Sequence, residues 1–150
     1  MSHRDQNGRI AYYSTIARNI SERKQFEAQL QHQATHDLLT GLANRVLLAE
    51  QLQTEIQRSA RLNHLTAVIF LDMDNFKRVN DSLGHSIGDQ LLQQVGVRLG
   101  RHIRSNDILA RYGGDEFVIV ANDLNDADTI TSILDKVKRA FEQPVRIARQ

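Results

Sequence analysis

The feature that most constrains the fold of this chain is an apolar run at residues 65–72, LTAVIFLD. Except for Thr66, every residue before the closing Asp72 is apolar. A near-continuous run of this kind is typical of a β-strand that is buried on both of its faces. Such a strand needs other strands beside it and helices over it, so the chain is expected to form a layered structure around it.

Helical and strand patterns alternate along the chain on either side of this run. Apolar spacing predicts helices over residues 44–61, 87–103 and 126–141. Strand patterns occupy residues 107–112 and 117–120, which a glycine-rich hairpin turn joins, and a last strand is expected to begin at residues 145–148. This order predicts an α/β or α+β fold with a mixed sheet.

The first 36 residues differ in character from the rest. Residues 5–8 have the composition of a turn, and residues 10–16 have a strand pattern. From Arg23 to His36 the sequence predicts a helix with a narrow apolar stripe and otherwise polar faces. A helix this polar is typical of a connector or of a coiled-coil seam.

Bulk composition excludes several classes of function. The 150 residues suffice for one domain, and 19 basic side chains against 18 acidic ones give a net charge of +1. No basic footprint for general nucleic-acid or membrane binding is present. The absence of cysteine excludes disulfides and thiolate metal sites. No membrane helix or signal peptide is predicted in this segment, so a cytoplasmic location is expected.

Two acidic clusters are candidates for chemistry. Asp72 and Asp74 end the apolar strand two residues apart, so in extended backbone their carboxylates point the same way. Asp115 and Glu116 lie in the hairpin turn, where two preceding glycines allow close approach of a ligand. Taken singly, each cluster is more often a solvated loop or an ordinary turn than a functional site. Brought together, they favour Mg²⁺ or Mn²⁺ over zinc and a phosphate-bearing substrate.

Several motifs together resemble one known family. RYGGDEF at residues 111–117 matches in full the signature of the GGDEF family of diguanylate cyclases. Residues 36–45, HDLLTGLANR, resemble the opening segment of that family, and residues 70–89 resemble its central stretch. These matches keep the family's order and spacing across residues 35–145. The resemblance implies a nucleotide-cyclase-like GGDEF fold, with a mixed, mostly antiparallel central sheet flanked by helices.

The resemblance also implies an activity, the condensation of two GTP into cyclic di-GMP and two pyrophosphates. Two Mg²⁺ or Mn²⁺ ions in each active site would be held by Asp72, the carbonyl of Met73 and Asp115. Asp115 would also be the base that activates a ribose 3′-hydroxyl, with Glu116 supporting the metal or taking part. Lys77 would stabilise negative charge that builds on the phosphates.

Nucleotide contacts follow from the same resemblance. Asn80 and Asp89 would bind guanine, and His85 would lie near the same substrate. Arg104 and Asp107 match the RxxD inhibitory site of the family, which implies feedback inhibition by cyclic di-GMP. Without the family match, a capped turn at Asn80 and an idle surface position at His85 would be the preferred interpretations.

Each domain would hold one GTP, so the resemblance implies a homodimer with facing catalytic domains. Residues 1–22 resemble the end of a PAS-like sensor domain, residues 23–35 a signalling helix, and residues 36–150 a GGDEF domain. That GGDEF domain is expected to lack its C-terminal strands and helix, so weak or no activity is expected of this fragment. Two alternatives stay open: a degenerate module that binds GTP or cyclic di-GMP to regulate a neighbouring domain, and a cyclase that makes a 3′,5′-cyclic mononucleotide.

Overall fold

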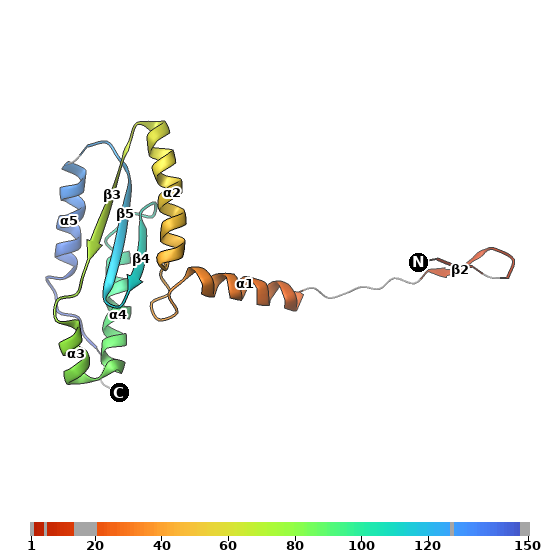
Figure 1. Cartoon of the computed structure of the whole chain (residues 1–150), viewed down its shortest axis with the longest axis horizontal. Coiled ribbons are helices and arrows are strands. Elements are labelled where there is room, and N and C mark those ends of the chain that lie inside the picture. Colours follow the sequence, from red (N-terminus) through yellow and green to blue (C-terminus); the bar gives the residue numbers. More distant parts are fainter. Residues whose placement is uncertain (1, 5, 14–20, 127, 148–150) are drawn as a thin grey trace. The chain divides into compact units, whose positions relative to one another are not determined.

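The structure is a computed structural model that describes residues 2–4, 6–13, 21–126 and 128–147. The chain divides into two compact units, residues 1–31 and 32–150, which are described separately below (Figure 1).

The first unit contains a short antiparallel hairpin and most of a helix. Strand β1 (Ser2–Arg4) pairs with β2 (Ile10–Tyr13) around a turn in which Gly8 has a φ of 76°. This confirms the predicted turn and the first part of the predicted strand; residues 5 and 14–16 lie outside the described residues. Helix α1 (Ser21–Thr35) follows, and its side chains from residue 23 to residue 34 are all exposed. The exposed apolar residues Phe26 and Leu30 form the narrow stripe expected from the sequence.

The second unit is built on a three-stranded sheet with the order β3-β5-β4. Its strands are β3 (Leu65–Leu71), β4 (Ile108–Gly113) and β5 (Glu116–Leu124), and both pairings are antiparallel. An isolated parallel bridge joins Ala43 to Ala110 at the edge of β4. The predicted class, a largely antiparallel sheet flanked by helices, is confirmed.

In the part of this unit that the structure describes, four helices accompany the sheet: α2 (Arg45–Leu62), α3 (Phe76–Leu83), α4 (His85–Gly100) and α5 (Asp128–Ala140). Asn44 caps α2, because its side-chain oxygen accepts hydrogen bonds from the amides of Val46 and Leu47 at 2.9 and 3.1 Å. The predicted helices form with shifted ends, and α3 was not predicted. It is too short to show an apolar period, and it lies between left-handed Asn75 and Gly84, whose φ is 88°.

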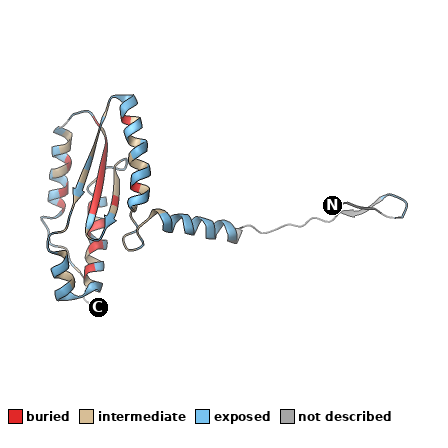
Figure 2. Cartoon of the chain, viewed as in Figure 1, coloured by how far each residue is buried: buried red, intermediate tan, exposed pale blue. Residues whose placement is uncertain are grey.

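The core lies on the two faces of β5 (Figure 2). Phe117, Ile119 and Ala121 pack against buried residues of α4 and α5. Val118 and Val120 point to the opposite face and pack against α2 and β4. Because successive side chains of a strand alternate between faces, β5 joins two helical layers through one apolar run.

The prediction that residues 65–72 form a strand buried on both faces was wrong. Within the described residues β3 pairs on one side only, with β5. Leu65, Val68 and Phe70 keep 50%, 42% and 66% of their surface exposed. An apolar run identifies a strand but not its position in the sheet, and here β5 is the central strand.

The strand expected to begin at residue 145 is absent from the described part of that segment, Val145 to Ile147, while residue 148 lies outside the described residues. Arg98 on α4 donates to the carbonyls of Ala140, Gln143 and Pro144. These bonds cap the end of α5 and use carbonyl groups just before the expected strand.

Candidate functional site

Asp72 and the β4–β5 turn lie at the same end of the sheet. Leu71, the last residue of β3, lies opposite Phe117 of β5. Asp72 follows Leu71, and Glu116 precedes Phe117, so the antiparallel register places them side by side at the end of the two strands. The two acidic segments found in the sequence are therefore brought to one edge.

The turn itself is tight. Gly113 pairs with Glu116, which leaves Gly114 and Asp115 as the two turn residues. Gly114 has a φ of 52°, a region that favours glycine. Asp115 is half-buried and Asp72 is exposed, and neither carboxylate forms a hydrogen bond or ion pair with another described residue. Both carboxylates keep their lone pairs for a ligand.

The oxygen atoms at this edge suit a hard divalent cation. The carbonyl of Met73 accepts a hydrogen bond from the amide of Phe76 at 3.2 Å, which holds the turn after β3 and leaves one lone pair of that oxygen. Across the described ranges, no three carboxylate or histidine side chains gather into a metal site. The oxygen ligands available here are the carboxylates of Asp72 and Asp115 and the carbonyl of Met73. This set fits Mg²⁺ or Mn²⁺, because these ions take their other ligands from water and substrate phosphates.

An ion pair that the sequence analysis did not identify supports this turn. Nη1 of Arg111 lies 3.0 Å from both carboxylate oxygens of Asp37. Nε and Nη2 of the same guanidinium donate to the carbonyl of Gly114 at 3.0 and 2.7 Å. Asp37 in turn accepts from the amide and hydroxyl of Thr40 at 2.9 and 2.7 Å. The loop that follows α1 is thus connected to the turn that carries Asp115.

The electrostatics of this link favour an ionised carboxylate. Burial by itself raises the pKa of Asp37, but the hydrogen bonds from Thr40 and the bond and charge of Arg111 outweigh that effect. The pKa of Asp37 is consequently below its ordinary value. Asp37 and Arg111 lie in two of the motifs that resemble the family, but nothing in the sequence indicated that their side chains meet.

The residues expected to contact nucleotide lie on α3 and α4. Lys77 and Asn80 are three residues apart on α3, and His85 and Asp89 are four apart on α4, so each pair shares a helix face. Lys77, His85 and Asp89 are exposed, whereas Asn80 is half-buried. Contact between α3 and α4 brings these four residues to one helical hairpin.

The predicted inhibitory pair lies at the opposite end of β4. Arg104 is exposed and precedes the strand, and its backbone amide donates to Asp107 at 2.9 Å. The other carboxylate oxygen of Asp107 accepts from the amide of Asn122 at 3.2 Å. The side chain of Asn122 donates to the carbonyl of Asn106 at 2.9 Å. Asp107 therefore orders the segment that carries Arg104.

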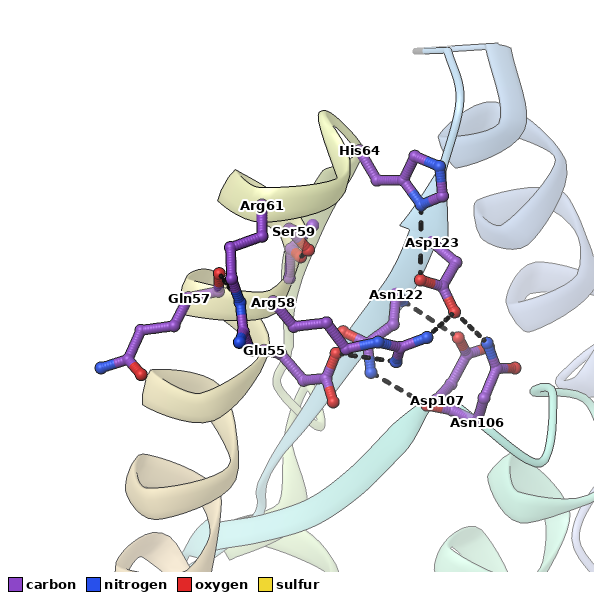
Figure 3. A network of polar contacts seen from close by, with 11 residues as sticks. Glu55, Gln57, Arg58, Ser59, Arg61, His64, Asn106, Asp107, Asn122 and Asp123 are labelled. Carbon is purple, nitrogen blue, oxygen red and sulfur yellow. Dashed lines mark hydrogen bonds and ion pairs between the residues drawn. The ribbon is translucent and has the colours of Figure 1, made fainter.

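A second carboxylate ties this segment to α2 (Figure 3). Asp123, in β5, accepts from Arg58 at 3.0 Å and from Asn106 at 3.3 Å, and its other oxygen lies 3.5 Å from Nδ1 of His64. Its φ of 55° is unusual for a residue other than glycine. Desolvation raises the pKa of Asp123, but His64, Arg58 and Asn106 together lower it below its ordinary value.

Arg104 also lines a cavity of about 480 Å³. The other residues that line it are mostly basic and come from the segment after α4 and from α5: Arg101, His102, Ile103, Lys136 and Arg139. Lys136 and Arg139 are three residues apart on one face of α5. Nothing in the sequence indicated these two residues, because only tertiary packing brings α5 beside the RxxD segment.

No helix formed by the described residues is long and apolar enough to cross a membrane. The layered fold, the tight acidic turn and the acidic end of β3 define a nucleotidyl-cyclase-like domain. Residues 34–150 match the family model described as the diguanylate cyclase, GGDEF domain. The chain therefore belongs to the GGDEF family.

Two curated relatives come from Pseudomonas aeruginosa. The bifunctional diguanylate cyclase/cyclic di-GMP phosphodiesterase MucR is 43% identical over 116 residues, which cover 77% of this chain and 17% of MucR. The diguanylate cyclase TpbB is 36% identical over 121 residues, which cover 81% of this chain and 28% of TpbB. The chain thus spans less than a third of the length of each of these relatives.

Solved structures of the family have the same fold. The GGDEF domain of TpbB aligns with a TM-score of 0.73 at 34% identity, covering 75% of this chain and 66% of that one. The coiled coil and GGDEF domain of DgcB from Caulobacter crescentus, in complex with cyclic di-GMP, aligns with a TM-score of 0.72 at 29% identity. That alignment covers 79% of this chain and 61% of the DgcB chain.

Proposed function

We propose that this domain is a diguanylate cyclase, which condenses two GTP into cyclic di-GMP. In each half-reaction a ribose 3′-oxygen bonds to the α-phosphorus of the other GTP, the bond from that phosphorus to the bridging oxygen breaks, and pyrophosphate leaves. The observation that carries the proposal is the shared edge of the sheet, where the register of Leu71 with Phe117 brings Asp72 beside the turn that contains Asp115. Family membership supports the same reaction.

Asp72, the carbonyl of Met73 and Asp115 would hold Mg²⁺ or Mn²⁺, with two ions in each active site. Bound divalent ions supply charge neutralisation for the phosphates and acidify the attacking hydroxyl. Asp115 takes the 3′-hydroxyl proton, and Glu116, at the next position, supports the metal or takes part in activating the hydroxyl. The exposed ammonium of Lys77 stabilises the charge that grows on the leaving phosphates.

Guanine would be bound at the α3–α4 hairpin. The amide of Asn80 and the carboxylate of Asp89 offer a donor and an acceptor for the two kinds of group on the guanine edge. His85 lies one helical turn before Asp89, on the same face of α4, and would contact the same nucleotide.

Catalysis requires two copies of this domain, because each holds one of the two GTP molecules that react. A homodimer with facing sites provides that proximity. We assign residues 23–35 as a signalling helix that pairs with its twin, residues 1–22 as the end of a PAS-like sensor, and residues 36–150 as the GGDEF domain. The exposed Phe26 and Leu30 are four residues apart on α1, which suits a narrow helix–helix seam.

Cyclic di-GMP would also bind as an inhibitor at Arg104 and Asp107. The basic cavity lined by Arg104, Lys136 and Arg139 supports this proposal, since its charges complement the two phosphates of the product. Replacing Arg104 with alanine is expected to weaken cyclic di-GMP binding about tenfold or more. Calorimetric titration with cyclic di-GMP measures this, and an unchanged affinity would refute the assignment.

The reaction is tested by incubating the purified full-length protein with GTP and Mg²⁺ and identifying the products by mass. We expect cyclic di-GMP from the wild type and none from Asp115→Asn. The exposed Asp135 on α5 offers a matched control, and Asp135→Asn is expected to keep the activity. A 3′,5′-cyclic mononucleotide as product would refute the proposal. That these 150 residues alone have weak activity or none remains a prediction for the same assay.

A second candidate function is a regulatory module that binds GTP or cyclic di-GMP without turnover. The observation that favours it is the match to NbdA of Pseudomonas aeruginosa, a cyclic di-GMP phosphodiesterase that is 33% identical over 146 residues covering 97% of this chain. Binding of GTP or cyclic di-GMP by a full-length protein that yields no product would favour this module over the cyclase.

A further inference from the structure

The amide oxygen of Asn80 is buried and has no hydrogen-bond partner among the described residues. A buried polar atom without a partner is costly, so its environment calls for an explanation. The oxygen lies at the contact between α3 and α4, two helices that Gly84 separates. The backbone amide of Gly84 donates to the carbonyl of Asn80 at 2.9 Å, which fixes the helix end around this side chain.

Gly88, on the first turn of α4, forms the other wall of this contact. A β-carbon built on Gly88 would lie 1.9 Å from Oδ1 and 3.0 Å from Cγ of Asn80, and 3.2 Å from Cζ of Phe76. The amide oxygen therefore lies directly against the α-carbon of Gly88. Gly88 is helical and its φ is not positive, so the lack of space, and not backbone strain, requires glycine here.

We propose that Gly88 is a positioning residue for guanine recognition, an inference that rests on the proposed function of Asn80 and Asp89. Because Gly88 has no side chain, the amide oxygen of Asn80 can pack against α4. The amino group of Asn80 then points away from α4 and is available as a hydrogen-bond donor. The next residue, Asp89, is exposed and supplies acceptors.

A donor beside a carboxylate matches guanine, which offers acceptor atoms next to N1–H and N2–H donors. Adenine lacks both of those donors, so this arrangement selects against it. Any side chain at position 88 would displace the Asn80 amide, and its amino group would no longer be placed beside the Asp89 carboxylate.

The test compares Gly88→Ala with Gly96→Ala. Both glycines are buried on α4. A β-carbon on Gly96 would lie 3.1 Å from Cδ1 of Leu42, so the added methyl group would meet apolar atoms and not Asn80. Affinities are measured by calorimetry with GTP and ATP analogues whose α,β-bridging oxygen is replaced by methylene, which prevents release of pyrophosphate. We expect Gly88→Ala to lower the GTP-to-ATP affinity ratio about five- to tenfold, the value of one lost hydrogen bond. Gly96→Ala is expected to leave the ratio unchanged.

Thermal unfolding supplies a second readout that needs no nucleotide. Forcing a methyl group against the Asn80 amide is expected to lower the Tm of Gly88→Ala by about 3 to 8 °C. In an Asn80→Ala background the same substitution is expected to be neutral or stabilising, because the methyl group then fills vacated space.

The outcomes distinguish a failure of the proposed guanine site from a failure of the proposed role of Gly88. A wild type that binds the GTP analogue no better than the ATP analogue overturns the proposed guanine site itself. A wild type that prefers GTP, together with a Gly88→Ala variant that keeps the full preference, overturns the role of Gly88. Equal Tm losses from Gly88→Ala in the wild-type and Asn80→Ala backgrounds would also overturn it.

Discussion

The two ends of the three-stranded sheet use carboxylates in opposite ways. At the turn end, Asp72 and Asp115 form no hydrogen bond or ion pair with another described residue. At the other end, Asp107 accepts two backbone amides and Asp123 accepts hydrogen bonds from three side chains. The same residue type thus stays available for a ligand at one end and holds the chain in place at the other.

The difference teaches how the proposed metal site can be held in place by neighbouring residues, without contacts from the carboxylates that would bind the metal. At the turn end the fixed geometry comes from neighbours, since Arg111 holds the carbonyl of Gly114 and Asp37 holds Arg111. The carboxylate of Asp115 is positioned by its backbone and keeps its charge uncompensated. At the other end of the sheet, removing the carboxylate of Asp107 would release the segment that carries Arg104.

The comparison predicts its largest effect for Asp72→Asn. Loss of one carboxylate from the shared edge is expected to lower cyclic di-GMP formation about 100- to 1,000-fold. Because this side chain has no described partner, Tm is expected to stay within about 2 °C of the wild type. Product assays and thermal melts measure the two quantities. A large loss of Tm would show that Asp72 also holds the chain in place, which would contradict the difference between the two ends of the sheet.

Asp107→Ala is expected to show the reverse behaviour. It leaves the amide of Asn122, a residue that is 1% exposed, without its acceptor, at a cost of about 1–3 kcal/mol in the free energy of unfolding. Urea denaturation measures this cost. Asp135→Ala, on the exposed face of α5, serves as the control and is expected to change stability by less than about 0.5 kcal/mol.

Arg111→Lys tests the support behind the turn. Lysine keeps the positive charge but cannot reach Asp37 and the carbonyl of Gly114 together, because it lacks the planar fork of arginine. We expect a loss of about 1–2 kcal/mol in unfolding free energy together with a lower rate of cyclic di-GMP formation. A variant that loses stability but keeps the full rate would show that the ion pair does not position the turn.

The smallest expected effect is on the pH dependence of stability. The pKa of Asp37 is lowered in the folded state, so the unfolded chain binds more protons over that range. The stability that this group contributes is complete above its unfolded pKa of about 3.9 and is lost as pH falls through the lower folded pKa. Melts between about pH 3 and pH 6 should therefore be less steeply pH-dependent in Asp37→Asn than in the wild type. Equal slopes would contradict this assignment.

Much of the second unit followed from local sequence patterns. The hairpin around residues 113–116, the helix after Asn44 and the acidic end of β3 were all predicted, because turn composition, capping and apolar periodicity act between near neighbours. The short helix α3 was missed, since its eight residues are too few to show a period. The strand expected from residue 145 is absent from residues 145–147, and just before it Arg98, which is distant in sequence, donates to the carbonyls of Ala140 and Pro144.

By itself, the sequence determined the family, the order of most elements and the acidic residues that are candidates for chemistry. Only the tertiary structure decided that β5 and not β3 is the central strand, that Asp37 meets Arg111 across 74 residues, and that Gly88 lies against Asn80. The physical reason is the range of the interactions. Backbone periodicity and turn chemistry are encoded within a few residues, whereas strand order, ion pairs and close packing depend on which distant segments the folded core brings together.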